Sequence, residues 1–279
     1  MTQVPNIKLT NGCSDTVEIP QFGFGVFQID PSETARAVRD AFAAGYRHID
    51  TAQMYQNEEG VGQAIAESGL RREEVFVTTK LNNGGHGTDS AVRELEKSLE
   101  RLGLDHVDLY LIHWPQPKRD LYVQTWEGFE RALASGLTRA IGVSNFQPAH
   151  LDRLAAETRT VPAVNQIELH PRLTQPELRE YHRAHGIATE AWSPIGQGES
   201  LSEESIVALA EKYGRTPAQV VLRWHIQIGN IVFPKSSNPQ RIAENIDIFD
   251  FELADDDVAT IESLNSDKRR GPNPDTFGN

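Results

Sequence analysis

The sequence of 279 residues lacks features that define several classes of protein. Its single cysteine, Cys13, can form no internal disulfide, which is typical of proteins from a reducing compartment. No apolar run approaches the roughly 18 residues that span a bilayer, and no basic-then-apolar start marks the chain for export. A net charge of -13 leaves no basic excess to neutralise the phosphates of a nucleic acid. We therefore predict a cytoplasmic protein that binds neither membranes nor nucleic acid.

The glycine pattern of a Rossmann dinucleotide-binding fold is also missing. That fold needs G-x-G-x-x-G after its first strand, and the segment FGFGVF at residues 22–27 does not supply it. No low-complexity linker divides the chain. We expect residues 1–279 to form a single domain.

Apolar, strand-like segments alternate with helical segments along the chain. The strand-like segments are residues 22–28, 47–52, 75–81, 107–114, 139–145, 163–170, 188–195 and 231–236. A strand followed by a helix, repeated eight times, predicts a (β/α)8 TIM barrel of the α/β class. The helical segment 31–45 opens with Ser32 as its expected N-cap and closes with Gly45.

The ends of the predicted barrel carry additions. The last crossover is longer than the others and is expected to hold two helices, residues 202–214 and 216–229. A short β-hairpin of residues 7–9 and 17–19 is expected to close the bottom of the barrel. The tail, residues 266–279, is rich in Pro, Gly and Asn and predicts an extended loop.

Ionisable side chains stand where consecutive strands end, and in such barrels the chemistry lies at that face. Asp50 ends the second strand, Lys80 the third and His113 the fourth, and Tyr55 follows in the loop after Asp50. Taken singly, these residues also have purely structural explanations: an aspartate can cap a helix, a histidine can be a core residue and a lysine can be solvated. Their occurrence together favours one shared site.

These side chains form a set suited to protonating an oxygen. An ammonium group beside a phenol lowers the pKa of the phenol, and a carboxylate keeps a buried lysine charged. We therefore predict Tyr55 as the proton donor, tuned by Lys80, which Asp50 keeps protonated, with His113 orienting a polar group. Hydride addition to a carbonyl creates such an oxygen without a protein nucleophile, and it needs a nicotinamide.

Motifs across nearly the whole chain resemble those of the aldo-keto reductases. They are DTAQMYQNEEGVGQAI, VTTKL, DLYLIHWP, IGVSNF, NQIELHP and FPKSSNPQRIAEN. The chain is most similar to the short bacterial branch that includes the 2,5-diketo-D-gluconic acid reductases. The resemblance implies a (β/α)8 fold, NADPH as the reductant, a small-molecule carbonyl substrate such as a keto-sugar acid, 2-ketoaldehyde or dicarbonyl, and a catalytic tetrad. That tetrad is Asp50, Tyr55, Lys80 and His113, with Tyr55 as general acid.

The resemblance also implies which residues hold the cofactor. The carboxamide contacts are Ser144, Asn145 and Gln166, and the aromatic residue stacked on the nicotinamide is Trp192. The 2′-phosphate clamp is Lys235, Ser236 and Arg241, and the adenine contacts are Glu244 and Asn245. Asn238 stands near where this branch is expected to carry a second arginine. Read alone, these residues are also compatible with turn, cap, core or solvated positions.

The apolar residues Phe27, Met54 and Trp114, with parts of the tail, are expected to line the substrate pocket, although ordinary packing explains them equally well. The loops 114–120 and 195–200 are short, which predicts an open site. Two other functions stay open: a Schiff-base aldolase using Lys80, and a non-catalytic NADPH-binding protein. A metal site on Asp50 and His113 lacks a third ligand in the sequence, and we expect no metal and a monomer.

Overall fold

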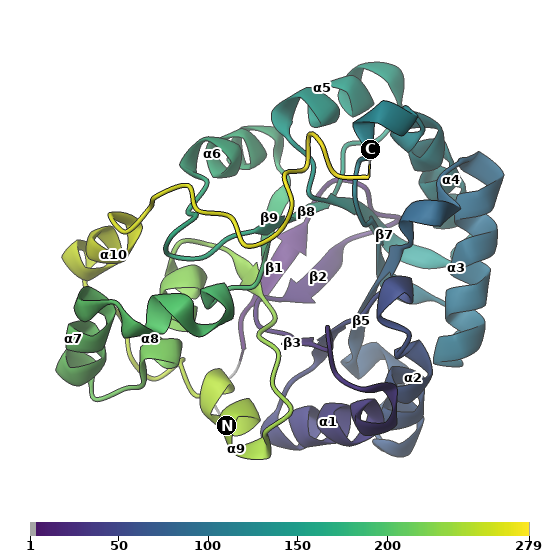
Figure 1. Cartoon of the computed structure of the whole chain (residues 1–279). Coiled ribbons are helices and arrows are strands. Elements are labelled where there is room, and N and C mark those ends of the chain that lie inside the picture. Colours follow the sequence, from purple (N-terminus) through teal and green to yellow (C-terminus); the bar gives the residue numbers. More distant parts are fainter. Residues whose placement is uncertain (1–3, 279) are drawn as a thin grey trace.

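Parallel strands form a barrel in the computed structural model, which describes residues 4–278 (Figure 1). Within that range the barrel sheet has eight strands, joined side by side in the order β3 to β10. The strands are β3 (Phe24–Gly25), β4 (His48–Asp50), β5 (Phe76–Leu81), β6 (Val107–Ile112), β7 (Thr138–Ser144), β8 (Val164–Glu168), β9 (Ala188–Trp192) and β10 (Ile231–Val232). A parallel bridge between Phe22 and Val232 closes the ring. The predicted (β/α)8 barrel is confirmed.

Helices surround the barrel. They are α1 (Pro31–Ala44), α2 (Glu58–Glu67), α3 (Thr88–Leu102), α4 (Tyr122–Ala134), α5 (Pro148–Glu157), α6 (Pro176–His185), α7 (Glu204–Tyr213), α8 (Pro217–Gln227), α9 (Pro239–Ile246) and α10 (Asp255–Glu262). The last crossover contains α7 and α8, as predicted. Short 3-10 helices that matter for the site are η1 (Gln53–Tyr55), η4 (Pro117–Arg119) and η5 (Gly196–Ser202).

The N-cap predicted for α1 is wrong by two residues. Asp30 is the cap, and its carboxylate accepts hydrogen bonds from the backbone N and the hydroxyl of Ser32, at 2.9 and 2.6 Å. Pro31 occupies the first helical position, where a missing N–H costs nothing, so the capping side chain must come before it. Gly45 ends the helix with a φ of 105°, as expected.

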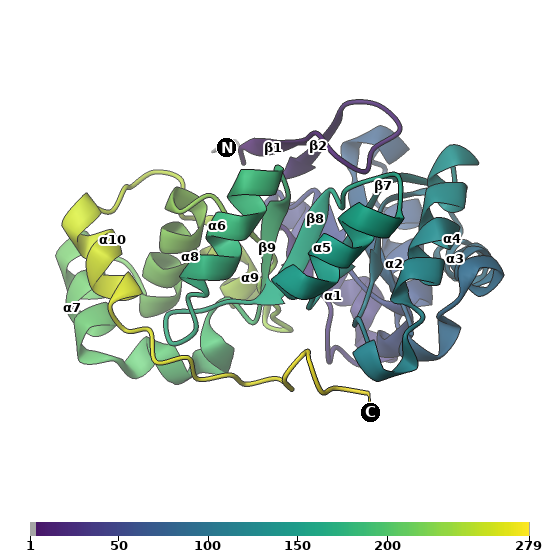
Figure 2. The same ribbon diagram turned by 90° about the horizontal axis from the view of Figure 1, so that it is seen from above.

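The predicted hairpin closes one end of the barrel. It consists of antiparallel β1 (Asn6–Leu9) and β2 (Val17–Pro20). Its Leu9, Val17 and Ile19 are buried in one apolar cluster with residues of the barrel strands. Figure 2 shows the hairpin and the C-terminal tail at opposite ends of the barrel, so the tail runs along the face where the strands end. Among the described residues no helix is long and apolar enough to cross a membrane.

Candidate active site

The structure brings the three strand-end residues and Tyr55 together at the C-terminal mouth of the barrel. Lys80 donates hydrogen bonds from Nζ to Asp50 Oδ1 at 2.6 Å and to the carbonyl oxygen of Thr51 at 2.9 Å. The same nitrogen lies 3.3 Å from the phenolic oxygen of Tyr55. His113 follows β6, and its ring meets the ring of Tyr55 edge-on with centroids 5.9 Å apart. Tyr55 is therefore in contact with both a cation and an imidazole.

A short, hydrogen-bonded loop places Tyr55 over the mouth. The hydroxyl of Thr51 donates to Asn57 Oδ1 at 2.9 Å, and Asn57 Nδ2 donates to the carbonyl oxygen of Val26 at 2.9 Å. Gln56, directly after Tyr55, has a φ of 56°, which turns the chain back toward α2. The segment HIDTAQMY thus ends a strand on Asp50 and returns a phenol above it.

Burial and neighbouring charges act in opposite directions on the pKa values of Lys80 and Asp50. Burial alone would lower the pKa of Lys80, but the charges of Asp50 and Tyr55 outweigh it and raise that pKa above its ordinary value. Burial raises the pKa of Asp50 and is opposed by the Lys80 charge. Lys80 therefore stays an ammonium ion, as predicted from the sequence.

Lys80 lowers the pKa of Tyr55 as the sequence predicts, but burial has a larger and opposite effect. Burial raises the pKa of the Tyr55 phenol, and the lowering effect of Lys80 does not overcome it, since the charge of Asp50 also raises that pKa. The phenol is consequently protonated at neutral pH. A proton donor has to start in that state, so the set still suits general acid chemistry.

His113 is a neutral imidazole at the wall of the mouth. It is buried, and burial, followed by the charge of Lys80, lowers its pKa to about 3. Its Nδ1 has no hydrogen-bond partner among residues 4–278. A neutral ring keeps one N–H donor, which can orient a polar group without transferring its own proton.

The residues assigned to the carboxamide form one connected group. Trp192 donates from Nε1 to Asn145 Oδ1 at 2.8 Å, and Asn145 Nδ2 lies 3.0 Å from both the carbonyl oxygen of His113 and Ser144 Oγ. Ser144 in turn donates to the carbonyl oxygen of Gln166 at 2.8 Å. Asn145 has a φ of 64°, so it sits at a sharp turn as well as in the group.

Gln166 is held by two carboxyl groups. Its Nε2 donates to Asp50 Oδ2 and to Glu190 Oε2, both at 2.8 Å. Reasoning from the sequence missed Glu190. An acidic residue inside an apolar strand segment, ATEAW at residues 188–192, was the available signal.

The residues assigned to the phosphate and adenine lie at and after the end of β10. Lys235 and Arg241 are exposed, and neither makes an ion pair with another residue in the described part of the chain. Ser236 Oγ accepts from the backbone N of Asn238 at 3.1 Å. Asn238 is the N-cap of α9, accepting from the backbone N of Gln240 at 2.9 Å and of Arg241. Glu244 and Asn245 follow within α9.

The three residues predicted to line the substrate pocket differ in how exposed their side chains are. Phe27 and Met54 are 47% and 42% exposed, and the Phe27 ring lies 5.0 Å from the ring of Tyr55. Trp114 is buried, and its ring packs against Phe277 of the tail at 4.4 Å. Phe27 and Met54 are thus free to meet a ligand, whereas Trp114 is partly covered by the tail.

The tail is fixed across the mouth by a buried carboxylate that the sequence reading missed. Glu168 at the end of β8 accepts from the backbone N of Arg270 at 2.5 Å and of Gly271 at 3.1 Å. Gly271 lies against the ring of Trp192, where a Cβ atom would meet Trp192 Cη2 at 2.4 Å. Only glycine permits this approach.

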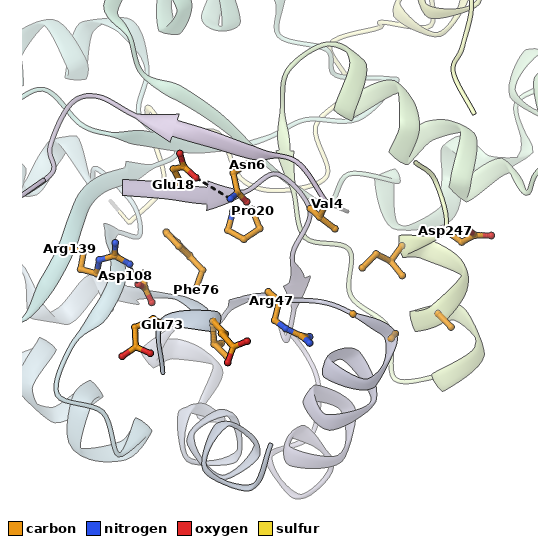
Figure 3. Close-up of a pocket in the computed structure, with 16 residues that line it drawn as sticks. Val4, Asn6, Glu18, Pro20, Arg47, Glu73, Phe76, Asp108, Arg139 and Asp247 are labelled. Atoms are coloured by element: carbon orange, nitrogen blue, oxygen red, sulfur yellow. Dashed lines mark hydrogen bonds and ion pairs between the residues drawn. The ribbon is translucent and has the colours of Figure 1, made fainter. Parts of the chain in front are cut away.

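A hollow lies at the other end of the barrel and contains none of the tetrad. Its volume is about 740 Å³, and it is lined by the hairpin and by residues at the starts of the strands, including Phe76, Asp108 and Arg139 (Figure 3). Asp108 is paired there with Arg72 and Arg139, each at 2.7 Å. Among residues 4–278, no group of three or more His, Cys, Asp or Glu side chains is placed to hold a metal ion.

The fold and the site together define the class of protein as a (β/α)8-barrel enzyme with polar groups gathered at the C-terminal mouth. A family model described as "Aldo/keto reductase family" matches residues 21–266, so the chain belongs to the aldo/keto reductase family. The resemblance seen in the sequence is confirmed.

Relatives with assigned activities extend this result. The chain is 51% identical to a glyoxal reductase of Bacillus subtilis, over 96% of each chain. It is 49% identical to the methylglyoxal reductase DkgA of Yersinia pestis, over 100% of this chain and 99% of that one. Among solved structures, a mutant of Gox0644 in complex with NADPH matches with a TM-score of 0.92 and 47% identity, over 98% of each chain.

Proposed function

We propose that the protein reduces small dicarbonyl compounds and 2-ketoaldehydes to alcohols, with Tyr55 as the general acid. It is an NADP(H)-dependent oxidoreductase of the aldo/keto reductase family. The observation that carries the catalytic assignment is the position of Lys80 Nζ, 2.6 Å from Asp50 Oδ1 and 3.3 Å from the Tyr55 hydroxyl. That contact links a buried ion pair to a phenol at the mouth of the barrel.

In this proposal the tetrad moves one proton. NADPH, when bound, supplies the hydride. As the carbonyl oxygen becomes negative, Tyr55 donates its phenolic proton to it, and the adjacent Lys80 ammonium stabilises the phenolate that remains. Asp50 keeps Lys80 charged, and neutral His113 offers a hydrogen bond that orients the same oxygen.

The proposed cofactor residues fit a nicotinamide dinucleotide phosphate. Lys235 and Arg241 are exposed cations without an acidic partner in the described chain, which suits a phosphate group. Ser236 lies between them in sequence beside the start of α9, whose N–H groups favour an anion. Ser144, Asn145 and Gln166 would hold the carboxamide, Trp192 would stack on the nicotinamide, and Glu244 and Asn245 would contact the adenine.

The proposed substrate class is supported by the names of two relatives and by the apolar surface at the mouth of the barrel. The relatives named above act on glyoxal and methylglyoxal by their names. Phe27 and Met54 present apolar surface beside Tyr55, and they would pack against a short carbon chain. A kinetic screen with NADPH against methylglyoxal, glyoxal, 2,5-diketogluconate and an aromatic aldehyde tests the proposal. A kcat/KM for the aromatic aldehyde well above those for the dicarbonyls would contradict it.

We predict that NADPH binds roughly tenfold or more tightly than NADH. Lys235 and Arg241 can pair with the 2′-phosphate that NADH lacks, and charge-assisted hydrogen bonds of this kind contribute about 1.5 to 3 kcal/mol before solvent screening reduces them. Fluorescence titration of both dinucleotides measures the ratio. The double variant Lys235→Ala/Arg241→Ala should bring it close to one.

The exposed Lys118 in η4 provides a matched control for that double variant. Lys118→Ala removes a cation of the same kind and should leave the NADPH to NADH ratio unchanged. Equal dissociation constants for the two dinucleotides in the wild-type protein would refute the clamp.

Two alternatives make different predictions. A Schiff-base aldolase needs a neutral lysine, but Asp50 raises the pKa of Lys80 and favours the charged amine despite burial. Trapping of a substrate on Lys80 by borohydride would revive it. A non-catalytic binder would bind NADPH tightly and turn over none of the carbonyls in the screen. The monomeric state and the cytoplasmic location stay predictions.

A further inference from the structure

Glu190 is a carboxyl group inside the barrel to which the proposed mechanism gives no role. It lies in β9 directly opposite Gln166 of β8 in the strand register, and its side chain is fully buried. Its Oε2 accepts a hydrogen bond from Gln166 Nε2 at 2.8 Å, and that nitrogen also donates to Asp50 Oδ2 at 2.8 Å. One amide group is therefore held between Glu190 and the carboxylate of the tetrad.

These two contacts determine which way the Gln166 amide points. Asp50 is ion-paired with Lys80, and an ionised carboxylate only accepts hydrogen bonds, so the amide nitrogen must face it. With both of its N–H groups engaged, Gln166 offers only Oε1 to any further partner. An accepting oxygen is complementary to the NH2 of a nicotinamide carboxamide.

The surroundings of the other Glu190 oxygen indicate that this acid carries a proton. His48 Nδ1 lies 3.3 Å from the carbonyl oxygen of Pro20, which can only accept, so Nδ1 bears the hydrogen. Nε2 is therefore an acceptor, and the hydroxyl of Thr78 lies 3.2 Å from it as its donor. Glu190 Oε1 lies 3.6 Å from that Nε2 and has no hydrogen-bond partner among the described residues. If Glu190 were ionised, Oε1 would be a buried, negatively charged oxygen beside an imidazole nitrogen that has no hydrogen to donate, which is unfavourable, so a neutral acid fits this position better.

Electrostatics agree with this assignment. Burial, and then the charge of Asp50, raises the pKa of Glu190 to about 8. Burial lowers the pKa of His48 to about 4, so the imidazole is neutral. The titratable groups that face or influence Glu190 are Asp50 and His48 of β4, Lys80 of β5 and Tyr55 of η1. Glu190 is accordingly neutral at pH 7 and becomes negative as the pH rises through about 8.

We propose that Glu190 is a positioning residue: as a neutral acid it holds the Gln166 amide so that Oε1 faces the carboxamide of the cofactor. The inference rests on the proposed contact between Gln166 and that carboxamide. It assigns to Glu190 no contact with the reacting atoms. Its effect is on the orientation of Gln166 and, through its charge, on Tyr55.

Two substitutions separate this role from simple packing. Glu190→Gln keeps a carbonyl oxygen for Gln166 and carries no charge at any pH, so it imitates the neutral acid. Glu190→Leu has similar bulk and no hydrogen-bonding group. The probes are NADP+ and its 3-acetylpyridine analogue, in which an acetyl group replaces the carboxamide and has no N–H to donate.

Dissociation constants from isothermal titration calorimetry at pH 6.5 provide the first readout. The wild type and Glu190→Gln should both bind NADP+ roughly fivefold more tightly than the analogue, as one hydrogen bond of about 1 kcal/mol implies. Glu190→Leu should lower this ratio, because Gln166 then keeps only its hydrogen bond to Asp50 and its amide is held less firmly. Glu58→Gln is the control, since Glu58 is equally buried but pairs with Arg101 and Thr79, away from Gln166.

The pH profile of carbonyl reduction provides the second readout. Ionised Glu190 adds negative charge near Tyr55, which raises the pKa of the phenol and makes it a weaker acid. The wild type should therefore lose activity relative to Glu190→Gln as the pH rises through 8, by roughly fivefold between pH 6.5 and 9.5. Because this comparison does not use Glu190→Leu, it tests the inference even if that variant does not fold.

The outcomes are distinct. Equal NADP+ to analogue ratios in the wild type and Glu190→Leu, or parallel pH profiles of the wild type and Glu190→Gln, would overturn the inference and leave Glu190 a packing residue. A wild-type protein that binds no NADP+ would instead overturn the proposed cofactor site.

Discussion

Replacing Tyr55 with phenylalanine is expected to lower kcat for aldehyde reduction by about 10² to 10⁴, the usual contribution of a general acid. The substitution removes the phenolic proton and keeps the ring, which packs 5.0 Å from Phe27 and 5.9 Å from His113. NADPH affinity should stay within about threefold of wild type, because no proposed cofactor contact involves the hydroxyl. Steady-state kinetics, NADPH titration and the melting temperature measure these effects.

Tyr110→Phe is the matched control for this variant. Tyr110 is fully buried, and its hydroxyl donates to the carbonyl oxygen of Ala91 at 3.2 Å, far from the tetrad in the outer layer of β6 and α3. Its loss should cost about 1 kcal/mol of stability and leave turnover unchanged. If Tyr55→Phe behaved like this control, with turnover within a few-fold of wild type, Tyr55 would be a packing residue and the general-acid assignment would fail.

Periodicity was sufficient to predict the order of the barrel strands but not their lengths. Buried parallel strands read as continuous apolar runs, and each run overlaps one observed strand. The run 231–236 is reduced to Ile231–Val232 as a strand, because Pro234 has no N–H with which to continue the ladder. The helix start at Asp30 was missed for a similar local reason, since Pro31 moved the cap forward.

That the four residues gather at one face could be predicted from the sequence, because Asp50, Lys80 and His113 lie at three different strand ends and Tyr55 follows Asp50 closely. Strand ends converge at one face of a barrel. The contact of Glu190 with Gln166 could not be predicted, because it depends on the register between β8 and β9, which no local pattern encodes. The net direction of the pKa shift of Tyr55 could not be predicted from the sequence either. It depends on how deeply Lys80, Asp50 and Tyr55 are buried together, and burial outweighs the cation.

The path of the C-terminal tail could not be predicted from the sequence either. Its composition predicted an extended loop, and the residues up to Gly278 contain no helix or strand after α10. Its path depends instead on contacts between distant segments, since the backbone of Gly271 binds Glu168 and Phe277 packs on Trp114. Such contacts have no periodicity that a sequence reading could detect.

Replacing Lys80 with methionine is expected to lower kcat by about 10² to 10⁴ and to leave NADPH affinity within about threefold. Methionine has similar length but removes the ammonium ion that would stabilise the Tyr55 phenolate, while no proposed cofactor contact is lost. It also leaves Asp50 as a buried carboxylate without its cation. Breaking a buried ion pair in this way typically costs about 3 to 5 kcal/mol, so the melting temperature should fall as well.

The double variant Asp50→Asn/Lys80→Met separates the loss of chemistry from the loss of stability. Asparagine can still accept the hydrogen bond from Gln166 Nε2, and it carries no charge, so most of the lost stability should return. Turnover should not return, because the phenolate still lacks its cation. Recovery of kcat together with the melting temperature would show that Lys80 acts only by neutralising Asp50. A large loss of NADPH binding with the chemical step preserved would place Lys80 in the cofactor site instead of beside the general acid.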